Sequence, residues 1–435
     1  MTLLDLAPRV ATEGPLADLP VVIVGAGPIG LAAAANLVER DIDFIVLEAG
    51  AEVADSMRAW GHTRLFSPWK HLVDPASRRL LESDGWELPT PERAPSGAEL
   101  VAEYVAPLAA HERLAPHIRT GTEVIAISRE GMDRTRTTGR AATPFVVRLR
   151  TADGAIEELN ARAVIDASGT YRQPNSLSSN GLDLIGMDDV ADNVSHALPD
   201  VLGRDRARFA GRHVTVVGAG HSAANTLLAL VSLARDEPDT KVTWLIRKSR
   251  AERVTASPDD ELAGRAELGS RVARAVRRGE IDVVDGFEIV RAQRAGERIE
   301  LVGRRGDGLD TVETDIVVNA TGFRPNLGML REMRIELDDI VEAPKRLAPL
   351  IDPNVHSCGT VDPHGFRELI HPEPNFFIVG MKSYGRAPTF LLATGYEQVR
   401  SVTAHLAGDA ASAAKIDLVL PATGVCSTDE GSCCS

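Results

Sequence analysis

A short apolar run, a glycine-rich turn and a helical pattern follow one another near the start of the chain. The run is Val21–Val24, the turn covers residues 25–30, and an alanine-rich stretch continues over 31–40. A second apolar run, Phe44–Leu47, ends at Glu48. Short β-branched runs favour buried parallel strands, and the alanine-rich stretch favours a helix. The pattern therefore predicts a β-α-β unit.

The same order recurs in the second half of the chain. Residues 214–217 form the apolar run, 218–223 the turn and 224–234 the helical pattern. The next apolar run, 242–246, is followed by Arg247 instead of an acid. Two β-α-β units predict an α/β protein with one parallel sheet for each unit.

Further strands and helices complete the predicted domain organisation. Segments separated by turn residues at 122–128, 145–150 and 156–159 predict a small antiparallel meander. We also expect strands at 163–166, near 281–303, at 316–319 and at 376–380, and helices over 97–110, 259–278 and 389–407. The predicted layout is an N-terminal arm (1–18), a first domain (19–205 and 330–420), a second domain inserted into it (206–329) and a polar, disordered tail (421–435).

The first glycine-rich turn has the spacing Gly-x-Gly-x-x-Gly, at Gly25, Gly27 and Gly30. Gly25 permits the tight turn, Gly27 lets a pyrophosphate approach the backbone, and Gly30 lets the helix pack on the strand. The helix start directs unpaired N–H groups at the phosphates. Glu48 accepts hydrogen bonds from ribose hydroxyls and repels a 2′-phosphate, so the turn suits FAD or NAD. The alternative is a strand-turn-helix unit without a ligand.

The second turn, Gly218-x-Gly220-x-x-Ala223, repeats this logic with alanine at the packing position. His221 and Ser222 stand at the helix start, where a hydroxyl meets phosphate oxygens. The following strand leads into Arg247 and Lys248, and a guanidinium pairs with a 2′-phosphate through two hydrogen bonds. The sequence therefore favours NADP(H) over NAD(H) here. The alternative is that Arg247 and Lys248 are a solvated loop pair.

Composition narrows the class of protein. The 435 residues are enough for two or three domains, and their net charge of −14 argues against nucleic-acid binding. No apolar run is long enough to span a membrane, and Asp5 and Glu13 interrupt any signal-peptide pattern. Four cysteines fit a reducing compartment. We expect a cytoplasmic protein that acts on a small molecule; the oligomeric state stays open, with a homodimer as one alternative.

With both turns in view, the chain resembles flavoproteins with two dinucleotide-binding domains, which include pyridine nucleotide-disulfide reductases and FAD/NADPH monooxygenases. The strand-end motifs 166–169 and 319–322 carry the resemblance together with the two turns. It implies two Rossmann-like domains of the three-layer ββα type, the NADP domain inserted in the FAD domain. The FAD contacts implied by turn and resemblance are Gly25, Gly27, Pro28, Ile29, Gly30, Glu48, Ser67, Ser168, Gly169, Gly380, Met381 and Thr389. The NADP contacts are Gly218, Gly220, His221, Ser222, Ala223, Arg247, Lys248 and Gly322.

Two departures from these relatives bear on the chemistry. Disulfide reductases of the group carry a cysteine pair, whereas this chain has no cysteine before Cys358, so its body cannot run a dithiol relay. The signature that precedes the second turn in the monooxygenases matches poorly at residues 184–196. Residues 61–69 and 380–390 and the cysteine tail are more similar to flavoproteins of bacterial arsenic- and metal-resistance clusters. That resemblance makes an arsenical one alternative for the substrate.

The candidates for acid–base or substrate roles are few. Trp60, Arg64, Phe66 and Trp69 follow the first β-α-β unit, where relatives fold over the flavin ring; the alternative is that the aromatic side chains belong to the core. The helix that begins near Thr389 is expected to point its N-terminus at the flavin. The catalytic candidates are Arg64, Lys382, Cys358 and His371. His356, Cys358, His364 and His371 match no standard zinc spacing.

Three of the four cysteines, Cys426, Cys433 and Cys434, lie in the last ten residues. Cys433 and Cys434 are neighbours, so a disulfide between them is strained and Cys426 is the easier partner. Three thiolates also suit a soft metal or a trivalent metalloid. The remaining alternative is an inert tail.

These observations leave two functions open. The first is an FAD oxidoreductase that takes hydride from NADPH and passes electrons to oxygen or to a small organic or metalloid substrate. The second is a flavoprotein that binds or sequesters a metalloid through its thiol tail, without oxygenation.

Overall fold

A computed structural model describes residues 16–248, 263–352, 363–387 and 390–418. The chain divides into two compact units, the second of which, residues 173–324, is inserted in the sequence of the first. The sequence predicts residues 173–205 in the first domain, but in the structure they belong to the second unit. The reason is that strand β8 (Val194–Ser195) pairs with strand β15 (Ile316–Asn319) of that unit.

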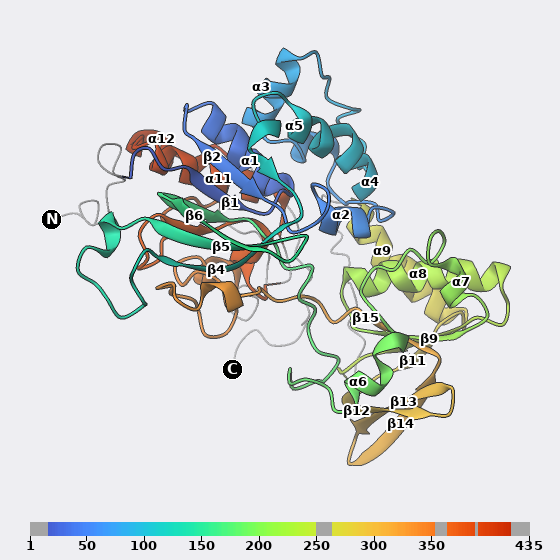
Figure 1. The fold of residues 1–435 in the computed structure, drawn as a ribbon. Coiled ribbons are helices and arrows are strands. Elements are labelled where there is room, and N and C mark those ends of the chain that lie inside the picture. The colour runs from blue at the N-terminus through green and yellow to red at the C-terminus, as the bar shows by residue number, and fades with distance from the viewer. Residues whose placement is uncertain (1–15, 249–262, 353–362, 388–389, 419–435) are drawn as a thin grey trace, which may run out of the picture. The chain divides into compact units, whose positions relative to one another are not determined.

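The first unit is built on a five-stranded parallel sheet (Figure 1). Its strand order is β16-β7-β1-β2-β3, so β1 lies in the centre between β7 and β2. The strands are β1 (Val21–Val24), β2 (Phe44–Leu47), β3 (Ile118–Arg119), β7 (Ala163–Asp166) and β16 (Phe376–Ile378). In the register, Val24 lies opposite both Leu47 and Asp166. The carboxyl ends of these strands therefore share one edge of the sheet.

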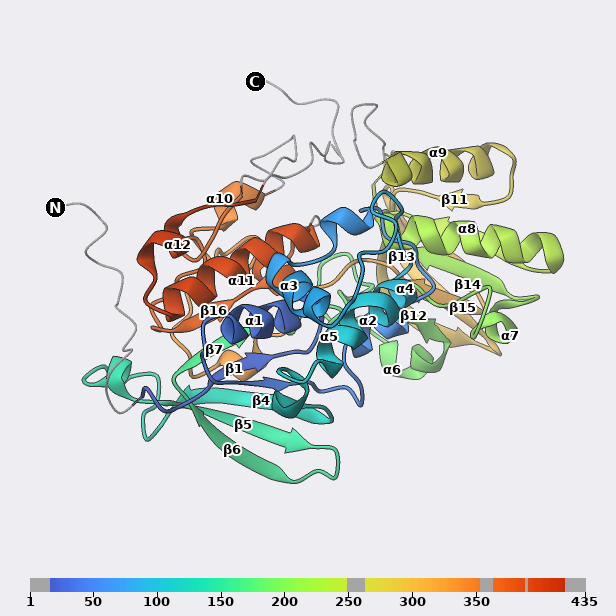
Figure 2. The same cartoon turned by 90° about the horizontal axis from the view of Figure 1, so that it is seen from above.

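Helices cover one face of this sheet and an antiparallel meander covers the other (Figure 2). Val21 and Ile23 face helices α1 (Pro28–Val38) and α11 (Leu392–Leu406), whereas Val22 and Val24 face the meander. The period of two along a strand separates these two sets. The meander consists of β4 (Thr122–Arg129), β5 (Phe145–Thr151) and β6 (Ile156–Ala161). This arrangement has the three layers expected of a ββα unit.

The second unit repeats the three layers. Its parallel sheet has the order β11-β10-β9-β15-β8, with helix α8 (His221–Asp236) following β9. A second antiparallel meander packs on the sheet through an apolar cluster that includes Val217, Leu245 and Phe287. For this second meander the sequence predicts only strands near 281–303, without their bounds. The strands of the second unit besides β8 and β15 are β9 (His213–Val217), β10 (Lys241–Leu245), β11 (Asp282–Val284), β12 (Phe287–Ala295), β13 (Arg298–Arg305) and β14 (Gly308–Thr314).

Shorter elements complete both units. The helical segment expected over 97–110 contains α4 (Gly97–Leu100), a π-helical turn (Val101–Val105) and α5 (Ala106–Ala110). The other helices are α2 (Asp55–Ala59), α3 (Pro75–Ser83), α6 (Met187–Val190), α7 (Arg206–Phe209), α9 (Ala263–Arg277), α10 (Ala348–Ile351) and α12 (Ala410–Ala414). Within the described ranges, none of these helices has the length and apolar character needed to cross a membrane. The two α/β units confirm the predicted fold class.

Candidate nucleotide-binding sites

The first glycine-rich turn is held between β1, β2 and β7. The N–H of Gly25 donates to the carbonyl of Leu47 at 2.7 Å, and its φ of +98° favours glycine. A Cβ atom on Gly25 would lie 2.9 Å from the Ala167 oxygen, and one on Gly30 would lie 1.9 Å from the Gly25 oxygen. A Cβ on Gly27 would meet no protein atom within 4 Å. The backbone therefore requires glycine at 25 and 30, whereas at 27 it leaves open space at the start of α1.

Glu48 joins the turn to the strand next to it. Its two carboxylate oxygens each accept a backbone N–H at 2.8 Å, one from Ala26 and one from Gly50. The side chain is largely buried. Each carboxylate oxygen accepts more than one hydrogen bond, so Glu48 keeps acceptor capacity for a hydroxyl. Glu48, which the sequence predicts to bind a ribose, therefore also holds the turn in place through these two hydrogen bonds.

The strand-end motif beside this turn contains a buried ion pair. Lys382 Nζ lies 2.6 Å from Asp166 Oδ2 and 3.0 Å from Ser168 Oγ. The hydroxyl of Ser168 in turn donates to Asp166 Oδ1 at 2.6 Å. Neither the Lys382 nor the Asp166 side chain has any solvent exposure. Lys382, a catalytic candidate in the sequence, therefore has its ammonium in an internal ion pair at the end of β7.

The loop after β16, a 3₁₀ turn over Gly380–Tyr384, reaches the same edge of the sheet. The N–H of Gly380 donates to Gln398 Oε1 of α11 at 2.7 Å. A Cβ on Gly380 would lie 3.2 Å from the side chain of Ile29, which stands in the first turn of α1. Gly380 has a φ of +67°, so this close approach also requires glycine. The fold thus brings the predicted residues Ile29, Ser168 and Gly380 together with the first turn.

The second turn has the same construction. Gly218 donates its N–H to the Leu245 carbonyl, and a Cβ there would lie 2.2 Å from the Ala320 oxygen. Gly220 has open space, because a Cβ would meet no protein atom within 4 Å. Gly220 is the N-cap of α8, which begins at His221 with Ser222 as its next residue. Ala223 is fully buried at the position that Gly30 holds in the first turn.

The strand register shows which residue of the second unit is equivalent to Glu48, and this residue lies one position before Arg247. Leu47 lies opposite Val24, and Leu245 lies opposite Val217. Glu48 donates its N–H to the next strand at Arg119, and Ile246 does so at Val284. The position of Glu48 is therefore taken by buried Ile246 in the second unit, and Arg247 comes one residue later.

Arg247 and Lys248 are exposed on the loop beyond this strand end. Arg247 NH1 donates to the carbonyl of Ser179 at 3.1 Å, and the Lys248 carbonyl accepts the N–H of Gly286. One hydrogen bond thus orients the guanidinium that the sequence assigns to a 2′-phosphate.

The strand-end motif of the second unit uses a neutral residue where the first uses a charged one. Asn319 Oδ1 accepts the hydroxyl of Thr321 at 2.7 Å, as Asp166 accepts that of Ser168. The Asn319 amide donates to the Asn175 carbonyl at 2.8 Å, and Gly322 accepts the N–H of Asn175 at 2.9 Å. The two-residue spacing of Asp166 to Ser168 and of Asn319 to Thr321 is the sequence signal for this turn.

Met381 follows Gly380 in the 3₁₀ turn and is half-buried. Of the other candidates, Arg64 is an exposed side chain that donates to the Ala94 carbonyl at 2.5 Å, and Ser67 is half-buried. His371 is buried, and this burial lowers its pKa to about 4, while its Nδ1 accepts the N–H of Glu336. Trp69 belongs to the apolar core. Cys358, Thr389, Cys426, Cys433 and Cys434 lie outside the described residues.

Fold and turns together define an α/β protein with two dinucleotide-type β-α-β units. Residues 22–345 match the pyridine nucleotide-disulphide oxidoreductase family, and the chain belongs to this family of oxidoreductases. The search of curated proteins gave no match.

Solved structures show the same fold at low sequence identity. The bacillithiol disulfide reductase of Bacillus cereus matches with a TM-score of 0.66 and 21% identity, over 89% of this chain and 98% of that one. The FAD-bound cadaverine monooxygenase of Erwinia amylovora matches with a TM-score of 0.61 and 14% identity, over 94% and 98%. A flavin monooxygenase from Stenotrophomonas maltophilia matches with a TM-score of 0.56 and 24% identity, over 89% and 98%.

Proposed function

We propose that the chain binds FAD in its first unit and NADP(H) in its second, and transfers electrons from NADPH to oxygen or to a small organic or metalloid substrate. The observation that carries this proposal is the contrast between two turns of the same construction. A carboxylate, Glu48, closes the first turn, whereas Ile246 and then Arg247 follow the strand of the second. Different charges at equivalent turns suit different nucleotides.

The first turn fits the pyrophosphate and ribose of FAD. The open space at Gly27 leaves the N–H groups at the start of α1 accessible to phosphate oxygens. Glu48 has acceptor capacity left for ribose hydroxyls. FAD bound here would supply an acceptor for the hydride of NADPH. Asp166, Ser168 and Lys382 hold the adjoining strand end in place.

The second turn fits NADPH better than NADH. In the first unit, the carboxylate of Glu48 would repel a 2′-phosphate. The equivalent residue of the second unit, Ile246, is apolar and carries no charge. The exposed guanidinium of Arg247 supplies hydrogen-bond donors in a planar arrangement that matches a phosphate. Two parallel N–H···O bonds account for the preference.

The cysteine positions favour an acceptor other than a protein dithiol. The first cysteine of the chain is Cys358, far beyond both glycine-rich turns and their following strands. Electrons therefore pass to oxygen or a small molecule in this proposal, as in the monooxygenases that share the fold.

A nucleotide titration tests the proposal. The purified protein is titrated with FAD and then mixed without oxygen with NADPH or NADH, while the flavin absorbance is followed. We expect NADPH to bleach the flavin, and Arg247→Ala to raise the Kd for NADPH, obtained from the concentration dependence of bleaching, about 10- to 100-fold, the worth of a charged hydrogen bond. Arg305→Ala, which changes an exposed arginine on β13, is the control and keeps the wild-type Kd. Failure to bind FAD at all contradicts the proposal.

A second function rests on the three cysteines near the C-terminus, Cys426, Cys433 and Cys434. In this case the chain binds a trivalent arsenical through their thiolates. Replacing all three with serine abolishes arsenite binding in an equilibrium assay and leaves reduction by NADPH unchanged. Equal arsenite binding by the serine variant removes this function.

A further inference from the structure

The ion pair of Lys382 with Asp166 costs more than the turn beside it requires. In the second unit Asn319 holds Thr321 by the same two-residue hydrogen bond without any charge. In the first unit the corresponding acceptor is a carboxylate with no solvent exposure, and its cation is equally buried. Burying two charges carries a desolvation penalty of several kcal/mol for each ion. The equivalent turn of the second unit closes without this penalty.

The strand-end residues of the two units, Asp166 and Asn319, bind different segments of the chain. Asn319 donates its amide to Asn175, which precedes β9 in the sequence. Asp166 instead binds Lys382, which belongs to the loop after β16, 216 positions further along the chain. The strand-end residue thus ties its own turn to the Gly380–Tyr384 loop, a segment from the other part of the discontinuous unit.

That loop is fixed from two sides. Gln398 Oε1 accepts the N–H of Gly380 at 2.7 Å, and the Gln398 amide donates to Ser383 Oγ at 2.9 Å. Lys382 anchors the same loop to Asp166 and Ser168. Between these anchors the Gly380 backbone lies against Ile29 at the start of α1. Both segments that adjoin the first turn, 168–169 and 380–381, are therefore held by one ammonium group.

We propose that Lys382 is a positioning residue for bound FAD, which sets the backbone of residues 380–381 against the Ser168–Gly169 turn. This inference rests on the proposed FAD site and deepens it. Without the ammonium group, the two segments keep the backbone bond from the Val379 N–H to the Asp166 carbonyl, but they lose their common side-chain anchor and Asp166 stays buried without a counter-charge. FAD affinity falls because the protein must then order these segments when the cofactor binds.

The test compares two buried charges of the same unit. Lys382→Met removes the anchor at the strand end. Glu373→Gln changes another buried carboxylate of this unit, which is paired with Arg129 and Arg140 at 2.8 Å each. Each apoprotein is titrated with FAD, and its Tm without FAD is measured in parallel. Lys382→Met is expected to raise the FAD Kd at least tenfold and to shift the visible spectrum of the bound flavin. Glu373→Gln is expected to lower the Tm but to keep the FAD Kd within twofold of wild type.

Two further variants keep the test decisive. Lys382→Gln retains a donor for Asp166 and covers the case in which Lys382→Met does not fold; a severalfold weaker Kd is expected. The double variant Asp166→Asn, Lys382→Gln replaces the ion pair with two neutral amides, so that the strand-end acceptor is neutral as Asn319 is in the second unit, and it is expected to recover most of the wild-type affinity.

Three results overturn the inference: wild-type FAD affinity in a folded Lys382 variant, equal loss of affinity in Glu373→Gln, or a double variant with wild-type Tm that still binds FAD weakly. A wild-type protein that binds no FAD at all is a different result. It contradicts the proposed function itself, before any variant is compared.

Discussion

The two units share a three-layer plan but differ in what they bury. Among the residues that the structure describes, every buried charged side chain lies in the first unit. The buried polar residues of the second unit are one serine and five threonines, such as Thr215 and Thr314. Its ion pair of Arg298 with Asp315 is partly exposed to solvent. The same architecture thus folds around buried charges in one unit and around neutral hydroxyls in the other.

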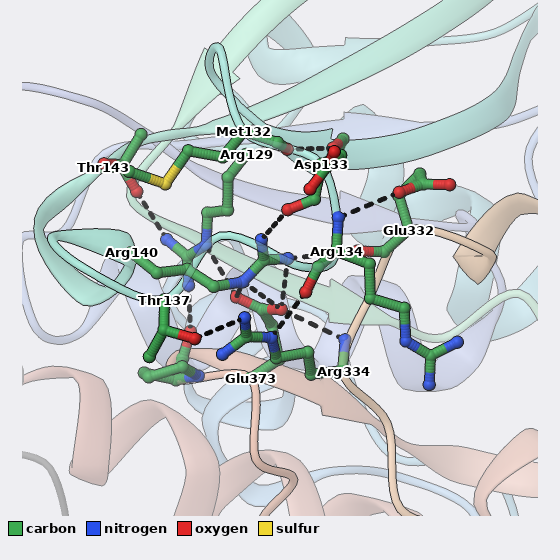
Figure 3. Close-up of polar contacts among 12 residues, drawn as sticks. Arg129, Met132, Asp133, Arg134, Thr137, Arg140, Thr143, Glu332, Arg334 and Glu373 are labelled. Atoms are coloured by element: carbon green, nitrogen blue, oxygen red, sulfur yellow. Dashed lines mark hydrogen bonds and ion pairs between the residues drawn. The ribbon is translucent and has the colours of Figure 1, made fainter.

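Two of the buried ion-pair clusters follow the connectivity of the chain. Among the described residues, the first unit consists of two stretches separated by the second unit, whereas the second unit lies within the single range 173–324. Glu373 accepts hydrogen bonds from Arg129 and Arg140, which lie more than 200 positions earlier (Figure 3). Lys382 and Asp166 join the same two stretches. Buried ion pairs are demanding in geometry, so they fix how the distant stretches meet at an energetic cost.

The largest expected effect is the loss of the Glu373 carboxylate. It has no solvent exposure, and its pKa is lowered by the two arginines despite burial. Glu373→Gln leaves both guanidinium groups against a neutral amide, so the free energy of unfolding falls by about 3–5 kcal/mol. The matched change in the second unit, Asp315→Asn, costs at most about 1 kcal/mol because that pair is partly exposed. Denaturant unfolding measures both; equal losses contradict the comparison.

The next effect depends on pH. Asp74 at the N-cap of α3 is fully buried, and desolvation raises its pKa to about 6 from 3.8. A raised pKa means that the native state keeps its proton while the unfolded state loses it. The free energy of unfolding therefore decreases as pH rises from about 4 to about 6, by about 3 kcal/mol in all. The difference between wild type and Asp74→Asn, measured across this range, should follow that curve; a flat difference contradicts it.

A smaller difference in stability is expected between changes at Gly30 and at Ala223, which hold the same position in the two turns. Gly30→Ala places a Cβ 1.9 Å from the Gly25 oxygen, so the turn must shift and stability falls by about 1–3 kcal/mol. Ala223→Gly removes a tolerated methyl group and costs about 1 kcal/mol through helix propensity. Thermal unfolding of each apoprotein distinguishes the two. A Gly30→Ala protein as stable as wild type shows that the first turn is wider than described.

The smallest expected effect comes from giving the second turn the residue type that closes the first one, a glutamate at the position of Ile246. Ile246→Glu puts a carboxylate at the position of Glu48, next to the N–H of Ala219 as Glu48 is next to that of Ala26. We expect the preference for NADPH over NADH, expressed as the ratio of kcat/KM, to fall about tenfold, or about 1.4 kcal/mol. Ile246→Gln, which lacks the charge, is the control and keeps most of the preference. An unchanged ratio in Ile246→Glu removes the role assigned to this position.

The sequence alone determined the local units of the fold. Strand period, alanine-rich helices and glycine spacing act over a few residues, so both β-α-β units and the first meander were predictable. The glycines at 25, 30 and 218 were also predictable, because each is required by a backbone contact within its own turn or with the neighbouring strand end.

Only the tertiary structure decided which distant segments meet. It assigned residues 173–205 to the second unit through strand pairing, and it placed Ile246 at the position of Glu48 through register. It also paired Lys382 with Asp166 and Glu373 with two arginines. Contacts between residues more than 200 positions apart depend on the packing of the whole sheet, and no local pattern of residues encodes them.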